Sequence, residues 1–279
     1  MNTPPLAEEL KTAQEVARRA GRLILNYYRT GLPPRFKDDQ SPVTRADLEA
    51  NALITEHLAA AFPNDRLLSE EAEAPAEYTG EARTWCVDPL DGTREFIDGN
   101  GEFTVMIGLA VHGEAALGVL YQPTEDLLVW GCNGRAGATR GGATLPVGVS
   151  SVTTLAGARV AVSRRRHPPL PEAVRRSLGD PTFVPLGGMG IKVLRVAMGD
   201  AELYLSESDL AKEWDTCAPE AVLRAAGGLM TDGFGRPLRY NKTPPGTPWG
   251  WVASNGALHQ AGLNAVRPSL KARTAGKPV

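Results

Sequence analysis

The sequence predicts a mixed α/β protein in which helices, antiparallel strands and a second α/β part follow one another along the chain. Between residues 6 and 61, apolar residues recur every three or four positions, as in amphipathic helices. Between residues 103 and 130, short apolar segments are separated by turn residues, as in antiparallel strands. After residue 148, strand and helix signals alternate, which indicates an α/β arrangement.

Composition limits the class of protein. The 279 residues are enough for one large domain or two lobes sharing a cleft, and 42% hydrophobic with 22% charged residues is ordinary for a globular chain. With 30 basic and 32 acidic residues the net charge is −2, so the chain lacks the excess of positive charge typical of proteins that bind a nucleic-acid polymer or a membrane surface. We therefore expect neither as a partner.

Cysteine usage and the N-terminus favour a cytoplasmic protein. Cys86, Cys132 and Cys217 are widely spaced and form no CxxC pair, so neither a disulfide framework nor a zinc site is indicated. The first nine residues lack the charged and apolar regions of a signal peptide, and no run of 18 apolar residues occurs.

The N-terminal part is expected to begin with two helices. The first spans residues 6–28 and ends at Gly31 and the following prolines, and the second spans residues 46–61 after a polar loop. A short strand at 66–69 then runs into Glu70-Glu71, an acidic loop follows at 72–81, and a second strand at 84–87 leads into the sequence Asp-Pro-Leu-Asp-Gly-Thr.

The central part is expected to form antiparallel strands. Segments 103–111 and 115–121 flank a turn at 112–114, and 127–130 adds a third strand. Residues 131–148 are rich in glycine but contain no GKS or GKT, so we interpret them as hairpins and turns that mark the boundary between two lobes.

The C-terminal part alternates between strand and helix signals. These cover 159–163, 171–178, 191–198 and 201–205, and a helix at 215–226 ends at a Gly-Gly pair before a late strand at 249–253. The expected organisation is an N-terminal lobe of residues 1–148, a C-terminal lobe of residues 149–266 and a disordered tail of residues 267–279.

Three acidic positions carry the candidate chemistry. Asp88 and Asp91 lie at the end of an apolar run and just before a glycine, in an oxygen-rich turn suited to a hard divalent cation. Glu70 and Asp215 lie on other segments and could complete a magnesium site if the chain brings them together. Taken alone, the turn could be only polar, and Asp215 could simply cap a helix.

These residues resemble the three signatures of the lithium-sensitive, magnesium-dependent inositol monophosphatase superfamily. The signatures are Glu70-Glu71, the sequence at 88–93, and Trp214-Asp215 with the segment 221–228. Within the superfamily, residues 93–96, 100–105 and 213–216 are most similar to the CysQ branch, the 3′(2′),5′-bisphosphate nucleotidases. The resemblance implies a layered α/β/α/β/α sandwich.

The resemblance also implies roles for individual residues. Two or three Mg²⁺ ions would be bound by four carboxylates and one backbone carbonyl, those of Glu70, Asp88, Asp91, Asp215 and Leu90. Thr93 would pair with Asp47 to orient and deprotonate a metal-activated water, and the N–H groups of Gly92 and Thr93 would hold the phosphate. Without the resemblance, Asp47 could be only a favourable charge at a helix N-terminus.

Contacts to the leaving group rest on weaker matches. Residues 188–192 replace the Gly-Ser-Ser-Leu-Lys of the branch with Gly-Met-Gly-Ile-Lys, so Lys192 could bind a second phosphate whereas both serines are lost. The run at 163–167 resembles Ser-Arg-Ser-His with extra arginines, and Arg164 is a candidate phosphate contact or part of a solvated patch. The resemblance makes Glu213 a candidate contact for a sugar hydroxyl.

The implied activity is hydrolysis of the 3′-phosphate of adenosine 3′,5′-bisphosphate by a lithium-sensitive, magnesium-dependent enzyme that is a monomer or homodimer. Inositol monophosphatase and fructose 1,6-bisphosphatase activities are the alternatives, and a phosphate or metal sensor is the non-enzymatic one. A phosphatase with an aspartyl-phosphate intermediate is a further alternative, and the sequence argues against it because Pro89 occupies the position of its nucleophile.

Overall fold

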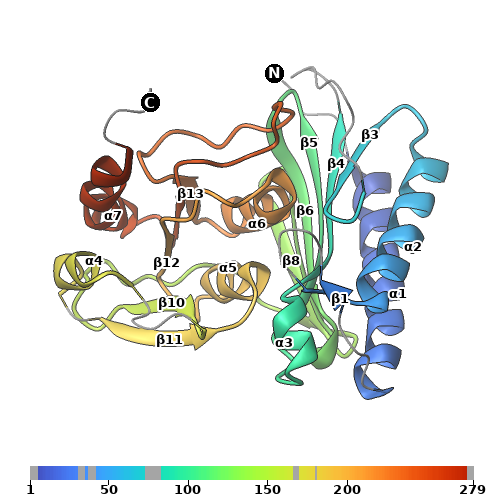
Figure 1. Cartoon of the computed structure of the whole chain (residues 1–279), viewed down its shortest axis with the longest axis horizontal. Helices are drawn as coiled ribbons and strands as arrows, with labels where there is room; N and C mark the ends of the chain where they lie inside the picture. The colour runs from blue at the N-terminus through green and yellow to red at the C-terminus, as the bar shows by residue number, and fades with distance from the viewer. Residues whose placement is uncertain are drawn as a thin grey trace.

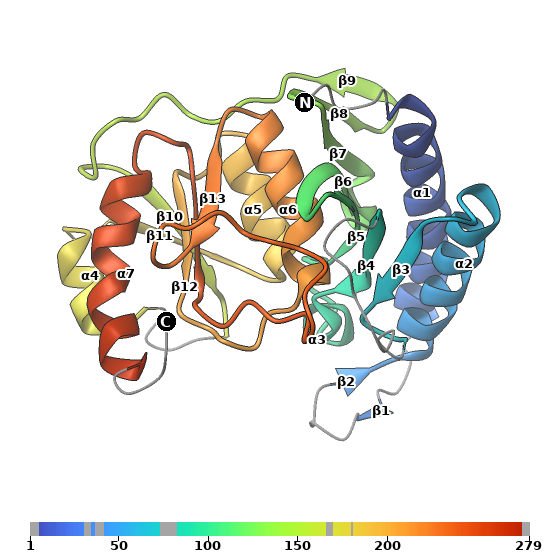
Figure 2. The same ribbon diagram turned by 90° about the horizontal axis from the view of Figure 1, so that it is seen from above.

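The computed structural model describes residues 6–30, 35–36, 42–72, 83–165, 170–179 and 181–274, and these form five layers (Figures 1 and 2). Helices α1 (Ala7–Thr30) and α2 (Arg45–Ala61) cover the outer face of a seven-stranded sheet. Helices α5 (Met189–Ala197) and α6 (Glu213–Ala225) separate it from a five-stranded sheet, which α4 (Glu172–Ser177) and α7 (His259–Thr274) cover on the far side. The predicted α/β/α/β/α sandwich is confirmed.

The first sheet contains the predicted antiparallel strands. Its order is β3-β4-β5-β6-β7-β8-β9, with β3 parallel to β4 and every other pair antiparallel. The glycine-rich segment forms hairpins, as expected. The strand bounds are Arg66–Ser69 (β3), Thr84–Asp91 (β4), Thr104–Val111 (β5), Glu114–Gln122 (β6), Leu127–Cys132 (β7), Arg135–Arg140 (β8) and Ala143–Leu145 (β9).

Smaller elements surround this sheet. The short strands β1 (Arg35–Phe36) and β2 (Pro42–Val43) pair before α2, helix α3 (Thr93–Ile97) follows β4, and the 3₁₀ turn η1 (Pro123–Glu125) joins β6 to β7. Most of the acidic loop predicted at 72–81 lies outside the described residues.

The second sheet has the order β11-β10-β12-β14-β13 and mixes parallel with antiparallel pairs. Strands β11 and β13 were not predicted. The bounds are Arg159–Ser163 (β10), Thr182–Leu186 (β11), Leu203–Ser206 (β12), Leu229–Asp232 (β13) and Trp251–Ser254 (β14).

Helix α7 corrects the predicted start of the C-terminal tail. The helix continues to Thr274, and the Leu270 side chain is completely buried, so the chain at Arg267 is inside a packed helix. Apolar contacts with the outer face of the second sheet outweigh the basic, small-residue composition on which the tail was predicted. The division into lobes at residue 148 stays a prediction, because α6 packs against strands of both sheets.

Helix α6 approaches the first sheet over a row of glycines. Gly108, Gly118 and Gly131 are direct neighbours on β5, β6 and β7. A Cβ atom on Gly118 would lie 2.3 Å from the carbonyl oxygen of Ala218, and one on Gly131 would lie 2.5 Å from that of Ala221. Only glycine permits this approach, which fixes where the N-terminus of α6 lies relative to the end of β4.

Candidate active site

The two motif carboxylates lie at an irregularity near the end of β4. This strand continues past its predicted end at residue 87 to Asp91, and its register with β5 shifts between Asp88 and Asp91. Such a bulge changes the direction of side chains and accommodates Pro89, which cannot donate to the ladder. Asp88 is 2% exposed and accepts a hydrogen bond from the Leu90 N–H at 3.0 Å.

Asp91 connects the first sheet to helix α5. Its Oδ1 accepts from the Met189 N–H at 3.0 Å, and its Oδ2 accepts from the Gly190 N–H at 2.7 Å and from the Thr104 hydroxyl at 3.1 Å. A Cβ atom on Gly188 would lie 2.2 Å from the Asp91 carboxylate, so glycine lets the start of α5 close onto it.

Asp215 and Glu70 approach the same place from other elements. Helix α6 begins at Glu213, two residues before its predicted start, so Asp215 is its third residue and not its N-cap. Its Oδ2 accepts from the N–H of the N-cap residue Lys212 at 2.6 Å, as the acidic residue of a capping box does. Glu70 follows β3, and its N–H donates to the Val87 carbonyl at 3.1 Å. The negative charges of Glu70, Asp91 and Asp215 all raise the pKa of Asp88, so the ionisation of Asp88 depends on the other three carboxylates.

The pKa values in this cluster show how unfavourable so much negative charge is there. Burial raises the pKa of Asp88 well above its usual range, and the three neighbouring carboxylates raise it further. Burial also raises the pKa of Asp215 to about 7. The pKa of Asp91 is raised by burial, against the opposing charge of Lys192. A divalent cation would offset these costs.

The donor set suits magnesium, because it consists of carboxylate and carbonyl oxygens. Within the described residues, however, no group of three or more His, Cys, Asp or Glu side chains has the arrangement of a metal site as it stands. The assignment of Glu70, Asp88, Leu90, Asp91 and Asp215 as ligands therefore stays a prediction.

The predicted pairing of Thr93 with Asp47 is present in the structure. The Thr93 hydroxyl lies 3.1 Å from Asp47 Oδ1 and 3.3 Å from the Leu90 carbonyl oxygen. Thr44 completes a capping box, since its N–H and hydroxyl donate to Asp47 Oδ2 at 2.7 and 2.5 Å. Burial raises the pKa of the Asp47 carboxyl, whereas the hydrogen bonds from Thr44 and Thr93 oppose the shift.

Gly92 provides the sharp turn from β4 into α3. Its φ of 94° lies in the left-handed region, and a Cβ atom there would lie 3.1 Å from the Glu102 carbonyl oxygen. Helix α3 begins at Thr93, as the resemblance implies. Phosphate binding by the Gly92 and Thr93 N–H groups stays a prediction.

The three side chains predicted to contact the leaving group are all bound to protein groups. Lys192 is 4% exposed, donates from Nζ to the Gly187 carbonyl and lies 5.1 Å from the centre of the Tyr204 ring. Arg164 binds both Glu102 carboxylate oxygens, at 2.6 and 3.2 Å. Glu213 is completely buried. Their substrate contacts stay predictions.

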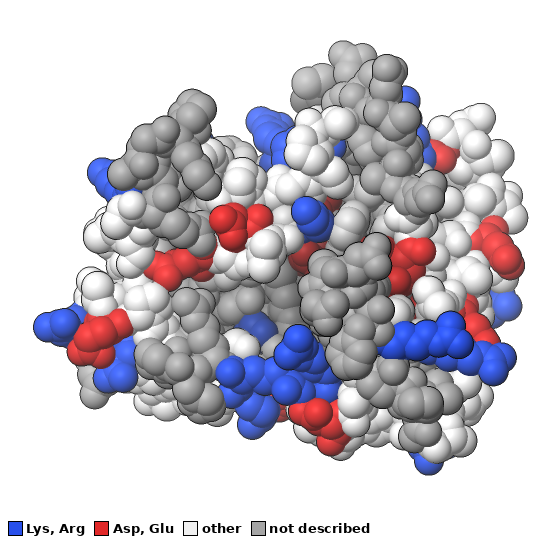
Figure 3. Space-filling model, viewed as in Figure 1, with Lys and Arg blue, Asp and Glu red and all other residues white. Residues whose placement is uncertain are grey.

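Sequence reasoning missed Arg165 as a residue of this site. It forms an ion pair with Glu95 at 3.0 Å and another with Asp98, and it donates to the Arg94 carbonyl at 3.1 Å. Arg165 follows β10 of the second sheet, whereas these partners lie on or beside α3. Figure 3 shows Lys and Arg side chains gathered over α3, below a hollow in this face. The only signal in the sequence was the run of arginines itself.

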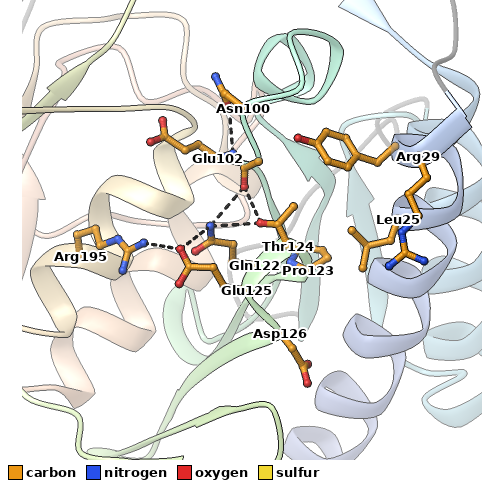
Figure 4. Close-up of a pocket in the computed structure, with 12 residues that line it drawn as sticks. Leu25, Arg29, Asn100, Glu102, Gln122, Pro123, Thr124, Glu125, Asp126 and Arg195 are labelled. Carbon is orange, nitrogen blue, oxygen red and sulfur yellow. Dashed lines mark hydrogen bonds and ion pairs between the residues drawn. The ribbon is translucent and has the colours of Figure 1, made fainter.

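A separate pocket of about 920 Å³ is lined in part by Asn100, Gly101 and Glu102 of the segment that follows α3 (Figure 4). Gln122 and Thr124 donate to the Gly101 carbonyl at 3.3 and 2.8 Å, and Arg195 of α5 forms an ion pair with Glu125 at 3.0 Å. None of the predicted metal ligands lines this pocket. Its walls instead support the backbone at Glu102, which accepts from the Gly188 N–H at 3.2 Å.

Sequence comparison relates the chain to a family of known proteins. The model of the inositol monophosphatase family matches residues 6–271. The chain is 36% identical over 233 residues to a 3′(2′),5′-bisphosphate nucleotidase CysQ of Shigella flexneri, covering 81% of this chain and 91% of the relative. It is 34% identical over 235 residues to a histidinol-phosphatase of Chlorobaculum parvum, covering 83% and 88%.

Among solved structures, the chain is similar to an inositol monophosphatase from Anabaena (Nostoc) sp. PCC 7120. The two are 28% identical with a TM-score of 0.75, over 94% of this chain and 96% of that one. None of the helices in the described part of the chain is both long and apolar enough to cross a membrane.

Proposed function

The chain belongs to the inositol monophosphatase family and is a phosphoric monoester hydrolase, and we propose on this basis that it is a magnesium-dependent enzyme that converts adenosine 3′,5′-bisphosphate to AMP and phosphate. The observation that carries the proposal is the position of Asp88 and Asp91 at the irregularity of β4, beside the contact of Thr93 with Asp47 and the Leu90 carbonyl; the charge of Asp215 acts on Asp88. Two or three Mg²⁺ ions would be held by these carboxylates with Glu70 and the Leu90 carbonyl.

The ions, when bound, supply positive charge that lowers the pKa of a water molecule and neutralises phosphate oxygens. This chain's own residues orient that water. The Thr93 hydroxyl directs its proton toward Asp47 Oδ1 and the Leu90 carbonyl, so its lone pairs can accept a hydrogen bond from the water. Asp47 is a suitable acceptor for the proton, because its raised pKa lies nearer the working pH than that of an ordinary carboxylate.

The phosphate itself would lie at the start of α3. Gly92 is the N-cap residue of α3, has a φ of 94° and makes no side-chain cap hydrogen bond, and glycine permits close approach of the phosphate to the backbone there. Basic side chains lie over this part of the surface (Figure 3), although Arg164 and Arg165 are paired with carboxylates, so an anionic substrate would compete with Glu102, Glu95 and Asp98 for them.

Three substrate classes compete with the bisphosphate. The similarity to a CysQ nucleotidase supports the nucleotide, whereas the shared metal motif also fits inositol 1-phosphate and fructose 1,6-bisphosphate. The similarity to a histidinol-phosphatase adds histidinol phosphate to the test.

A cytoplasmic monomer or homodimer is the proposed form, with its three cysteines as free thiols.

The test is phosphate release from all four compounds, measured side by side with magnesium and ranked by kcat/KM. Adenosine 3′,5′-bisphosphate should rank first, and lithium should inhibit its hydrolysis. D91N should lower kcat by at least a hundredfold, because it removes a carboxylate from the metal site. Equal phosphate release by D91N would refute the metal assignment, and a higher rank for another compound would refute only the substrate.

A further inference from the structure

Glu213, the first residue of α6, has a fully buried carboxylate whose two oxygens are both hydrogen-bonded. Its Oε2 accepts from the Asn241 N–H at 2.8 Å. Its Oε1 accepts from the Lys242 N–H at 2.9 Å and from the Lys242 ammonium at 2.9 Å. Because its side chain has no exposed surface, Glu213 makes its contacts to the segment 238–248 rather than toward a cleft.

The segment 238–248 surrounds the N-terminus of α6. The Glu213 N–H donates to the Pro245 carbonyl at 3.0 Å, and the Thr247 N–H donates to the Ala211 carbonyl at 2.8 Å. Lys212 also forms a β-bridge with Gly246. Farther along α6, the Tyr240 hydroxyl donates to Glu220 at 2.5 Å. The first turn of α6 is therefore held by a segment that leaves β13 and returns to β14.

This first turn also sets the position of Asp215. The Asp215 N–H donates to the Lys212 carbonyl at 3.2 Å, and the Lys212 N–H donates back to Asp215 Oδ2 at 2.6 Å. Lys212 and Glu213 are adjacent residues, and both are bonded to the segment 238–248. A displacement of that segment would consequently be transmitted to the Asp215 carboxylate through this single turn.

We propose that Glu213, together with Lys242, is a positioning residue that fixes the Asp215 carboxylate for metal binding, in place of the sugar contact that the family resemblance implied. The inference rests on the proposed function, because it takes Asp215 as a metal ligand. A group that orients a metal ligand typically changes metal affinity by 10- to 100-fold when it is removed. A buried carboxylate that loses its cation also disturbs its surroundings more than an exposed one.

The experiment titrates metal-free protein with Mn²⁺ in the absence of substrate and follows free Mn²⁺ by electron paramagnetic resonance. E213Q should bind Mn²⁺ at least tenfold more weakly than the parent protein. K242M should weaken binding in the same direction, whereas K242R, which keeps the charge, should restore most of it. With saturating magnesium, the KM of each variant for its phosphate ester should stay within about twofold of the parent value.

E114Q is the matched control. Glu114 pairs with Arg239 at 2.7 Å near the start of the same segment, but both side chains are more than half exposed. Its loss should leave Mn²⁺ binding unchanged. Circular dichroism and thermal unfolding verify that each variant is folded, and K242M provides the answer if E213Q does not fold.

Two other outcomes separate the possible failures. If E213Q and K242M bind Mn²⁺ like the parent protein and E213Q raises only KM, Glu213 contacts the substrate and the positioning role is wrong. D215N must itself lose Mn²⁺ binding. If D215N binds Mn²⁺ normally, the metal assignment of the proposed function is wrong, and the role of Glu213 falls with it.

Discussion

At the scale of single residues, the contact between Thr93 and Asp47 is the most specific chemical feature of the site. The residues are 46 positions apart in sequence and meet at 3.1 Å. Thr44 occupies the other oxygen of Asp47, so only Oδ1 faces the motif. The carboxylate is thus held in a single orientation, with one oxygen left for the Thr93 hydroxyl.

Removal of the Thr93 hydroxyl should reduce catalysis more than binding. T93A is expected to lower kcat by about 10²- to 10⁴-fold, the usual range for a group that positions or transfers a proton, with little change in KM. T93S keeps the hydroxyl and should retain most of the activity. Steady-state phosphate release measures both variants.

T55A supplies the control, because it removes a threonine hydroxyl from α2, the helix that carries Asp47. The Thr55 hydroxyl donates only to carbonyl groups of α2, at 2.8 and 3.3 Å. The activity of T55A should match that of the parent protein. If T93A retained full activity, the hydroxyl would have no part in orienting water.

His259 gives the protein a predictable dependence of stability on pH. Its ring is 6% exposed, and its Nε2 and Nδ1 lie 2.9 Å from the hydroxyls of Thr231 and Ser254. The Thr231 hydroxyl donates to the Asp232 carbonyl, so the neutral ring donates from Nε2 and accepts at Nδ1. Burial lowers the pKa of His259 from 6.5 to about 4, and the charge of Arg267 contributes to this shift.

The direction in which stability changes with pH follows from the number of protons bound by the folded and the unfolded chain. Between pH 6.5 and about 4 the unfolded chain binds the proton and the folded one does not, so the stabilisation is complete above pH 6.5 and is lost as the pH falls through this window. The loss should be on the order of 3 kcal/mol in the free energy of unfolding. Urea unfolding at pH 7.5 and 4.5 should show a smaller difference for H259Q than for the parent protein.

H112Q is the control for this measurement, because His112 lies in the exposed turn between β5 and β6. Its pH dependence should equal that of the parent protein. An identical pH dependence for H259Q would show that the pKa of His259 is not lowered in the folded state.

At the scale of elements, the position of α6 depends on the glycine row of β5, β6 and β7. A methyl group on Gly118 would meet the backbone oxygen of Ala218, which cannot move without the whole helix. Helix α6 carries Asp215 and Glu213 and lies on the face of the first sheet opposite to α1 and α2. A shift of α6 would therefore move Asp215 relative to the carboxylates of β4. Close packing of the interior transmits such a shift rather than absorbing it.

G118A should therefore reduce both stability and activity. The expected loss is about 1–3 kcal/mol in the free energy of unfolding, the range for overpacking a core. Denaturant unfolding and phosphate release check the two effects. G148A is the matched control, because nothing lies within 4 Å of a Cβ atom at Gly148 and its φ is not positive. Equal stability of G118A and G148A would contradict the close approach.

The elements also show where sequence reasoning succeeded and where it failed. The helices and hairpins of the first sheet could be predicted, because their apolar periodicity is continuous. Strand β11 was missed because it contains Pro185 and pairs only with β10, at the edge of its sheet. Strand β13 was missed because its four residues directly follow a Gly-Gly pair that reads as a helix end.

The site shows the same contrast. The carboxylates proposed as metal ligands could be identified from the sequence because they lie in short motifs at the ends of elements. The partners of Arg164 and Lys192 could not, because hydrogen bonds between distant segments leave no periodic pattern in the sequence. Glu213 is the clearest case, since its partners lie 28 and 29 positions away, on a segment with no predicted element.

At the scale of the whole molecule, two arginines after β10 hold the two sheets together beside the site. Arg164 forms an ion pair with Glu102, and Arg165 forms ion pairs with Glu95 and Asp98. The segment after β10 is therefore bound to α3 and to the segment that follows α3. In Figure 1, α3 lies at the lower edge of the molecule between the two sheets. The position of α3 is therefore determined by both halves.

R165Q should loosen α3 with only a small effect on global stability. Arg165 is 38% and Asp98 51% exposed, and ion pairs of this kind contribute about 1 kcal/mol or less to folding. Glu95, however, is only 9% exposed and would lose its cation two residues after Thr93. We expect kcat/KM to fall about tenfold, equivalent to about 1.4 kcal/mol of transition-state stabilisation.

The control for R165Q is R176Q, which removes an exposed arginine of α4 that pairs with Glu172 at 3.4 Å. Its kcat/KM should be unchanged. High salt should weaken the pairs of Arg165, so the difference between R165Q and the parent protein should shrink as ionic strength rises. A double-mutant cycle with E95Q then measures the coupling directly: if R165Q and E95Q lower kcat/KM independently, the two halves do not act on α3 through this pair.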